Sequence, residues 1–138
     1  MAGLQELIRN EADGGISFGN YEATQKMKLD NFQNAGNLYK VKTFREITKL
    51  EKNGLFLYES VPGTTVYNFK ESDNEITFTV EGNEDAQITV GLKESQNYEV
   101  FVDEVSVGTI NSGLGGKVSM STELEAKQTV SLRYILHG

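Results

Sequence analysis

A glycine-rich run ahead of a lysine is the stretch of this sequence closest to a ligand-binding motif. The segment "NSGLGGKVSMS" (111–121) places three glycines just before Lys117. A phosphate-binding loop has the form G-x-x-x-x-G-K-[ST] and lies between a buried strand and a helix. Here Asn111 occupies the first glycine position, and Val118 stands where the hydroxyl is needed. The residues that follow alternate as in a strand, so we expect a hairpin turn and no nucleotide site.

Acidic turns supply a second kind of chemistry, because carboxylate and amide oxygens bind calcium. One turn gathers four such residues: Glu81, Asn83, Glu84 and Asp85. Their spacing is not that of an EF-hand loop, so calcium binding and plain solvation both stay open as readings.

Other catalytic and metal-binding arrangements lack their residues. The chain has no cysteine, and its one histidine, His137, lies one residue from the end. Thiolate or imidazole metal sites and histidine-based nucleophilic catalysis therefore have too few suitable groups. We expect no cofactor and no enzymatic activity.

Aromatic side chains bear on carbohydrate binding, since sugars stack on flat rings. Tryptophan is absent, but the chain has six tyrosines. The candidates for a sugar-binding surface are Tyr21, Tyr39, Tyr58 and Tyr67. The alternative is that these rings fill the core or pair across strands.

Length and charge limit the partners. The 138 residues suit a single domain, and the net charge of −7 disfavours nucleic acid and anionic lipid. No apolar run is long enough to span a membrane, and the N-terminus lacks a signal-peptide pattern. We therefore expect no membrane insertion and a cytoplasmic location.

Alternation of apolar and polar residues governs most of the chain and predicts half-buried antiparallel strands. In "EITFTVEG", Ile76, Phe78 and Val80 share one face, and turn residues separate this run from the next. The same pattern places these residues on a core face: Ile88, Val90, Leu92, Tyr98, Val100, Val102, Val105, Val107, Val118, Met120, Val130, Leu132 and Tyr134. The sequence therefore predicts an all-β antiparallel sandwich or jelly roll.

Two segments have helical spacing. Leu4, Leu7 and Ile8 precede Gly14-Gly15 and predict a short amphipathic helix or arm over residues 1–15, ahead of one all-β domain at 16–138. A frayed terminus is the alternative reading of this segment. The spacing of "FREITKLEKNG" (44–54) predicts a second short helix, which ends at its Asn-Gly pair.

Lysines also recur along two of the predicted strands. Lys26 and Lys28 lie in one, and Lys40 and Lys42 in the next. We expect them to protect sheet edges or to face solvent.

The runs "YKVKTFREITKLEKNGLFLYESVPGTTVYNF" and "YEVFVDEVSVGTINSGLGGKVSMSTEL" resemble a family of small clostridial proteins that are often labelled endosialidase. The resemblance covers most of the chain, from about Glu6 to Leu132. Sialidases resemble six-bladed propellers of several times this length, and their aspartate boxes, S-x-D-x-G-x-x-W, are absent here. We therefore do not expect the activity to carry over. The region from Tyr98 to Ile135 also resembles all-β accessory modules of polysaccharide-degrading enzymes.

These observations favour a non-enzymatic structural or interaction protein that self-associates. The expected partner of the chain is then a second copy of itself, with the assembly contact formed by Leu4, Leu7 and Ile8 of the arm. The alternative is a carbohydrate-binding accessory module that uses the four tyrosines on a glycan.

Overall fold

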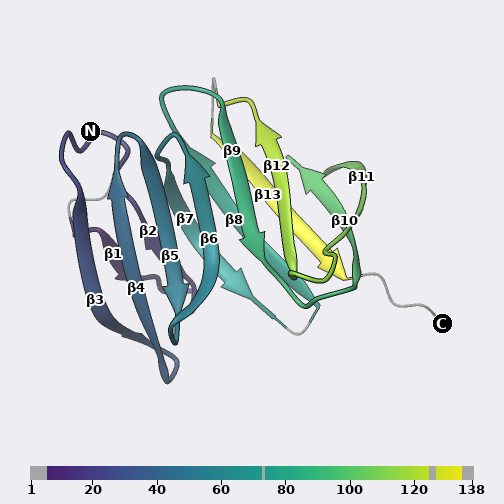
Figure 1. Cartoon of the computed structure of the whole chain (residues 1–138), viewed down its shortest axis with the longest axis horizontal. Helices are drawn as coiled ribbons and strands as arrows, with labels where there is room; N and C mark the ends of the chain where they lie inside the picture. Colours follow the sequence, from purple (N-terminus) through teal and green to yellow (C-terminus); the bar gives the residue numbers. More distant parts are fainter. Residues whose placement is uncertain (1–5, 73, 125–126, 135–138) are drawn as a thin grey trace.

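The computed structural model describes residues 6–72, 74–124 and 127–134 as thirteen strands in two antiparallel sheets (Figure 1). Sheet A has seven strands, in spatial order β1 (Ile8–Asn10), β2 (Ile16–Phe18), β7 (Thr65–Glu71), β8 (Glu75–Glu81), β13 (Gln128–Tyr134), β10 (Asn97–Val102) and β11 (Val105–Asn111). Sheet B has six, in order β12 (Lys117–Thr122), β9 (Ala86–Gly91), β6 (Leu55–Val61), β5 (Ile47–Lys52), β4 (Asn37–Phe44) and β3 (Met27–Asn34). The prediction of an all-β antiparallel fold is confirmed.

The chain builds the two layers by crossing between them. Strands β3 to β6 form a continuous meander in sheet B, and β7–β8 and β10–β11 are hairpins in sheet A. The connections after β2, β6, β8, β9, β11 and β12 each pass to the other sheet. The outermost strands are β1 and β11 in sheet A and β12 and β3 in sheet B, and Figure 1 shows β3 and β11 at opposite sides of the molecule.

Aromatic rings fill the core between the sheets. Phe18, Tyr58, Phe69 and Phe78 are all at most 3% exposed, and their ring centres lie 5.3 to 6.4 Å apart. Most contacts are edge-to-face, the arrangement that ring quadrupoles favour. Three of these rings come from β2, β7 and β8, so the cluster lies on the β1 side of sheet A.

A chain of buried hydroxyl groups adjoins the aromatic cluster. The Tyr58 hydroxyl lies 2.8 Å from Thr64 Oγ1, and Ser60 Oγ lies 2.7 Å from the same atom. Thr48 Oγ1 donates to the Thr64 carbonyl and accepts from its amide. Because every one of these polar groups has a partner, burying them costs little.

The predicted helix at 44–54 is wrong. Phe44 ends β4, Ile47 begins β5, and the intervening Arg45-Glu46 pair forms a two-residue turn. Leu50 is fully buried between Val41 and Tyr58 of the neighbouring strands, and this cross-strand burial outweighs the threefold spacing.

The glycine-rich run forms a turn over residues 113–116, as expected, but not a hairpin. It carries the chain from β11 in sheet A to β12 in sheet B. The Gly113 carbonyl accepts from the Ser95 amide, and the Gly116 carbonyl accepts from the Leu92 amide. The loop is thereby fastened to the connection between β9 and β10, and Lys117 begins a strand rather than a helix.

Candidate functional site

The described part of the N-terminal segment, residues 6–15, is neither a helix nor a detached arm. Ile8–Asn10 forms β1, which pairs with β2 at the edge of sheet A. Leu7 and Ile8 are 8% and 3% exposed and belong to the chain's own core, so the predicted assembly contact at these two residues is wrong. Leu4, the third residue of that prediction, lies outside the described residues. The Gly14-Gly15 pair closes the loop between β1 and β2.

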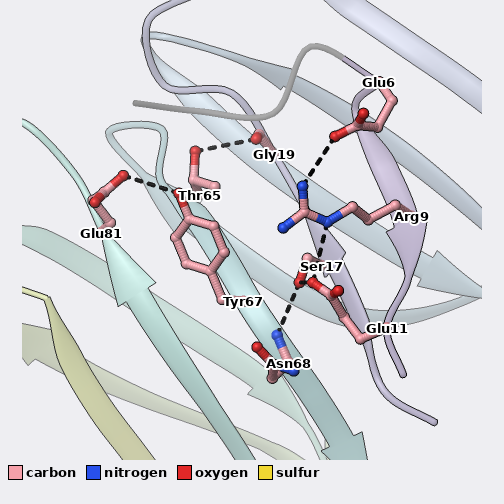
Figure 2. Close-up of polar contacts among 9 residues, drawn as sticks. All are labelled: Glu6, Arg9, Glu11, Ser17, Gly19, Thr65, Tyr67, Asn68 and Glu81. Atoms are coloured by element: carbon pink, nitrogen blue, oxygen red, sulfur yellow. Dashed lines mark hydrogen bonds and ion pairs between the residues drawn. The ribbon is translucent and has the colours of Figure 1, made fainter. Parts of the chain in front are cut away.

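Polar contacts tie this segment to β7 (Figure 2). Ser17 Oγ donates to the Glu11 carboxylate and accepts from the backbone amide of Asn68 at 3.0 Å. Arg9 Nε lies 3.1 Å from the same carboxylate, and Thr65 Oγ1 donates to the Gly19 carbonyl. The buried Leu7 and Ile8 and the polar groups named here therefore have their partners inside the chain.

The tyrosines do not form an exposed sugar-binding platform. Tyr58 is fully buried, and Tyr21 and Tyr39 are each 6% exposed. Tyr67 is half-buried on the outer face of sheet A. The prediction of a glycan surface is wrong for the first three, because the two sheets and their loops cover the rings.

Two of these tyrosines meet one residue of the acidic turn. The hydroxyls of Tyr21 and Tyr67 donate to Glu81 Oε1 at 3.2 and 3.1 Å, and Lys127 Nζ lies 3.6 Å from Oε2. Burial and the neighbouring Glu81 carboxylate raise the pKa of the Tyr21 phenol, so it remains a hydrogen-bond donor. Figure 2 shows the Tyr67 contact, which links β7 to the end of β8.

A cavity of about 520 Å³ opens beside this cluster at the end of the sandwich. Its lining comes from Tyr21, Arg45, Glu46, Val61, Pro62, Gly63, Asn83 and Glu84. The lining mixes one guanidinium with two carboxylates, and Tyr21 is buried. No single ligand charge is favoured by this lining.

The acidic turn is engaged in contacts within the fold. Besides the Glu81 contacts, Asp85 Oδ1 accepts from the Leu124 amide at 3.2 Å. Within residues 6–72, 74–124 and 127–134, no three acidic or histidine side chains converge as metal ligands. Among the same residues, no helix is long and apolar enough to cross a membrane.

The feature that sequence reasoning missed is the edge strand β11. Its residues are exposed from Val105 to Thr109, and Val105 and Val107 are 65% and 62% exposed. The sequence placed both valines on the core face. In the structure no described strand lies beyond β11 in sheet A, so one side of its backbone lacks a partner strand there.

The other three edge strands carry protective features. β1 has only three residues and includes Arg9, and β12 begins with Lys117. β3 contains Lys28 and Asp30, followed by a bulge at Asn31. Short length and charge each discourage pairing with another chain. The sequence of β11, "VSVGTIN", has no charged residue.

No family model, curated protein or solved structure matches this chain.

Proposed function

We propose that this protein is a non-enzymatic structural or interaction protein that self-associates by pairing β11 with β11 of a second copy. The single observation that carries the proposal is the exposed and uncharged β11 edge with its two valines. An unpaired edge of this kind is a template for a further strand.

The chemistry of β11 favours a second copy over an unrelated strand. Two identical strands related by a twofold axis pair antiparallel, and here no charged side chains are brought opposite one another. A bulge at Val107 increases the local twist of β11. Because a partner strand must have matching twist, another β11 meets this condition directly.

The surroundings of β11 are compatible with this pairing. The β10–β11 turn contains Asp103 and Glu104, and both lie before the strand rather than within it. With antiparallel pairing centred on Val107, Glu104 of one copy lies level with Ile110 of the other. The acidic turns of the two copies then lie at opposite ends of the β11–β11 interface, which avoids repulsion between them.

Single cysteines test the pairing, because the chain has none of its own. One cysteine is introduced at each of Val105, Ser106, Val107, Thr109, Ile110 and Asn111, followed by mild oxidation and non-reducing electrophoresis. Two cysteines bridge only when their Cα atoms lie about 4.4–6.8 Å apart. We expect disulfide-linked dimers at one or two adjacent positions near the twofold axis, and a decline on either side.

The matched control introduces cysteine at Lys28, Asp30 and Gln33 of the exposed edge strand β3. These variants should remain monomeric on the gel. Equal cross-linking in β3 and β11, or none in β11, would refute the proposal.

A further inference from the structure

Lysines gather on the outer face of sheet B. Thr43, Val41, Thr48 and Leu50 point into the core, so the alternate residues of β4 and β5 point outward. The lysines on this outer face are Lys28, Lys40, Lys42, Lys49 and Lys117, together with Lys26, whose Nζ lies 5.9 Å from the outward Phe44 ring. They are six of the chain's ten lysines, in a protein with a net charge of −7.

Three of these lysines form a row across adjacent strands. The register pairs Lys28 of β3 directly with Lys42 of β4, and Lys42 with Lys49 of β5. Neighbouring strands lie about 4.8 Å apart, so the row spans roughly 10 Å at right angles to the strands. We call Lys28, Lys42 and Lys49 the lysine row.

The lysine row differs from the chain's other cations in its pairing. Arg9, Lys52, Lys70, Lys127 and Arg133 form every ion pair found among the described residues. None of these five lies on the outer face of sheet B. Glu59 stands opposite Lys49 and Glu51 opposite Lys40, but neither forms an ion pair with its lysine in the described part of the chain.

This arrangement opposes folding, because like charges directly opposite on neighbouring strands are destabilising. Lys42 has a lysine on both sides, and the chain has twenty acidic residues that could have balanced it. Edge protection accounts for Lys28 on β3 but not for Lys42 and Lys49, which lie on interior strands. We propose that the lysine row binds a linear polysaccharide that carries carboxylate groups.

The geometry favours a polymer over a small molecule. The three ammonium groups project from the face of a sheet, whereas small-molecule sites are concave. Lysine presents a flexible point charge without the bidentate fork of arginine, which suits successive anions more than one oriented group. The backbone of β4 and β5 is already paired within the sheet, so only side chains are available to the ligand.

The rest of the charge distribution favours one class of polymer. Duplex nucleic acid carries one negative charge for about every 1.7 Å of its length. A protein of net charge −7 would therefore repel it strongly. A bilayer presents charge over an area much wider than three strands, and so would also face the acidic loops. An extended acidic peptide usually binds along an edge strand, whereas this row runs across strands. A polysaccharide with one carboxylate per sugar has lower charge density and fits the width of the row.

The test measures binding of polygalacturonate to the full chain and to a variant with Lys28→Gln, Lys42→Gln and Lys49→Gln. A lysine near an anionic surface contributes a factor of roughly five in affinity. The triple variant should therefore bind roughly a hundredfold more weakly at low salt. Between roughly 10 mM and 1 M salt the Debye length falls about tenfold, so the wild-type complex should also dissociate.

The matched control replaces Lys52, Lys70 and Lys127 with glutamine, which changes the net charge equally and leaves the outer face of sheet B intact. It should retain most of the wild-type affinity, and neutral dextran should not bind any of the three proteins. Circular dichroism and thermal melting verify that all three are folded. Because β11 is unchanged, the molar mass of the triple variant should equal that of the wild type, which separates this proposal from the one on self-association.

Three results would overturn the inference. The first is an equal loss of affinity in the control, which would indicate a generic charge effect. The second is an absence of polygalacturonate binding by the wild type at low salt. The third is tighter binding of polyglutamate or duplex DNA through the same lysines, which would assign the row to another class of polyanion.

Discussion

The two outermost strands at opposite sides of the sandwich, β3 and β11, differ in how they meet solvent. β3 contains Lys28 and Asp30 and bends at a bulge. β11 also has a bulge, at Val107, but its exposed residues are valine, serine, glycine and threonine, without a charge. Both strands are largely exposed, so the contrast lies in their chemistry rather than in their burial.

This difference indicates that the fold protects one edge and leaves another available. The β1–β3 side also contains the aromatic cluster and the hydrogen bonds that secure residues 7–19 to β7. The β10–β11 side has fewer buried groups, and its last strand contributes only the partly buried Ile110 to the core. Stability and association would then depend on opposite sides of the same sandwich.

The largest expected effect separates these two sides by stability. Phe69→Ala removes a ring that contacts Phe18, Tyr58 and Phe78, and should lower the free energy of unfolding by about 3–5 kcal/mol. Val105→Ala at the exposed edge should change it by less than about 0.5 kcal/mol. Urea denaturation at a concentration where the protein is monomeric measures both. A similar loss of unfolding free energy in the two variants would contradict this difference in stability between the two sides of the sandwich.

A smaller effect concerns the lysine row at the β3 side. Lys42→Gln relieves repulsion from Lys28 and Lys49, and should raise the free energy of unfolding by about 0.2–1 kcal/mol. Lys40→Gln, whose neighbour in β5 is Glu51, should give no such gain. Urea denaturation at low salt distinguishes them, and a destabilised Lys42→Gln variant would count against uncompensated repulsion in the row.

The smallest effect is a pH dependence near β1. Asp13 accepts hydrogen bonds from the Gly15 amide and the Asn68 side chain and lies 3.7 Å from Lys70 Nζ. The Gly15 bond, followed by those from Asn68 and Lys70, lowers the pKa of this carboxyl below its ordinary value. A lowered pKa in the folded state gives stability that is present above the unfolded pKa and lost as pH falls through the folded one.

The corresponding measurement compares unfolding free energies of wild type and Asp13→Asn between neutral and acid pH. The wild type should be slightly more stable near neutrality, and the difference should shrink as pH falls below about 4. If the difference in unfolding free energy instead grew as pH fell, Asp13 would not stabilise the fold through its lowered pKa. The same titration should leave self-association through the uncharged β11 largely unchanged.

Much of the sandwich was predictable because alternation reports which residues share a face. Ile76, Phe78 and Val80 are buried as expected. Val105 and Val107 belong to an alternating run as well, yet they are exposed, because the pattern does not tell whether another layer covers that face. The burial of a terminal strand depends on the other sheet, which the local sequence does not encode.

The remaining errors have similar causes. The Phe44–Leu50 spacing suited a helix, but the Arg45-Glu46 turn between β4 and β5 has neither glycine nor proline to announce it. In the lysine row, Lys28 lies 14 positions before Lys42 along the chain, and Lys42 lies 7 before Lys49. Only the strand register brings the three side by side. Leu7 and Ile8 had the composition of an arm, whereas pairing with β2 places them in the core.

The measurement that tests the central claim most directly is molar mass in solution by light scattering over a range of concentrations. It compares the wild type with Val105→Lys/Val107→Lys on β11 and with Met27→Lys/Leu29→Lys on β3, where the replaced side chains are 40% and 39% exposed. We predict an oligomer for the wild type and the β3 variant, and a monomer for the folded β11 variant. A wild type that stays monomeric at all concentrations, or a β11 variant that assembles as the wild type does, would contradict self-association through β11.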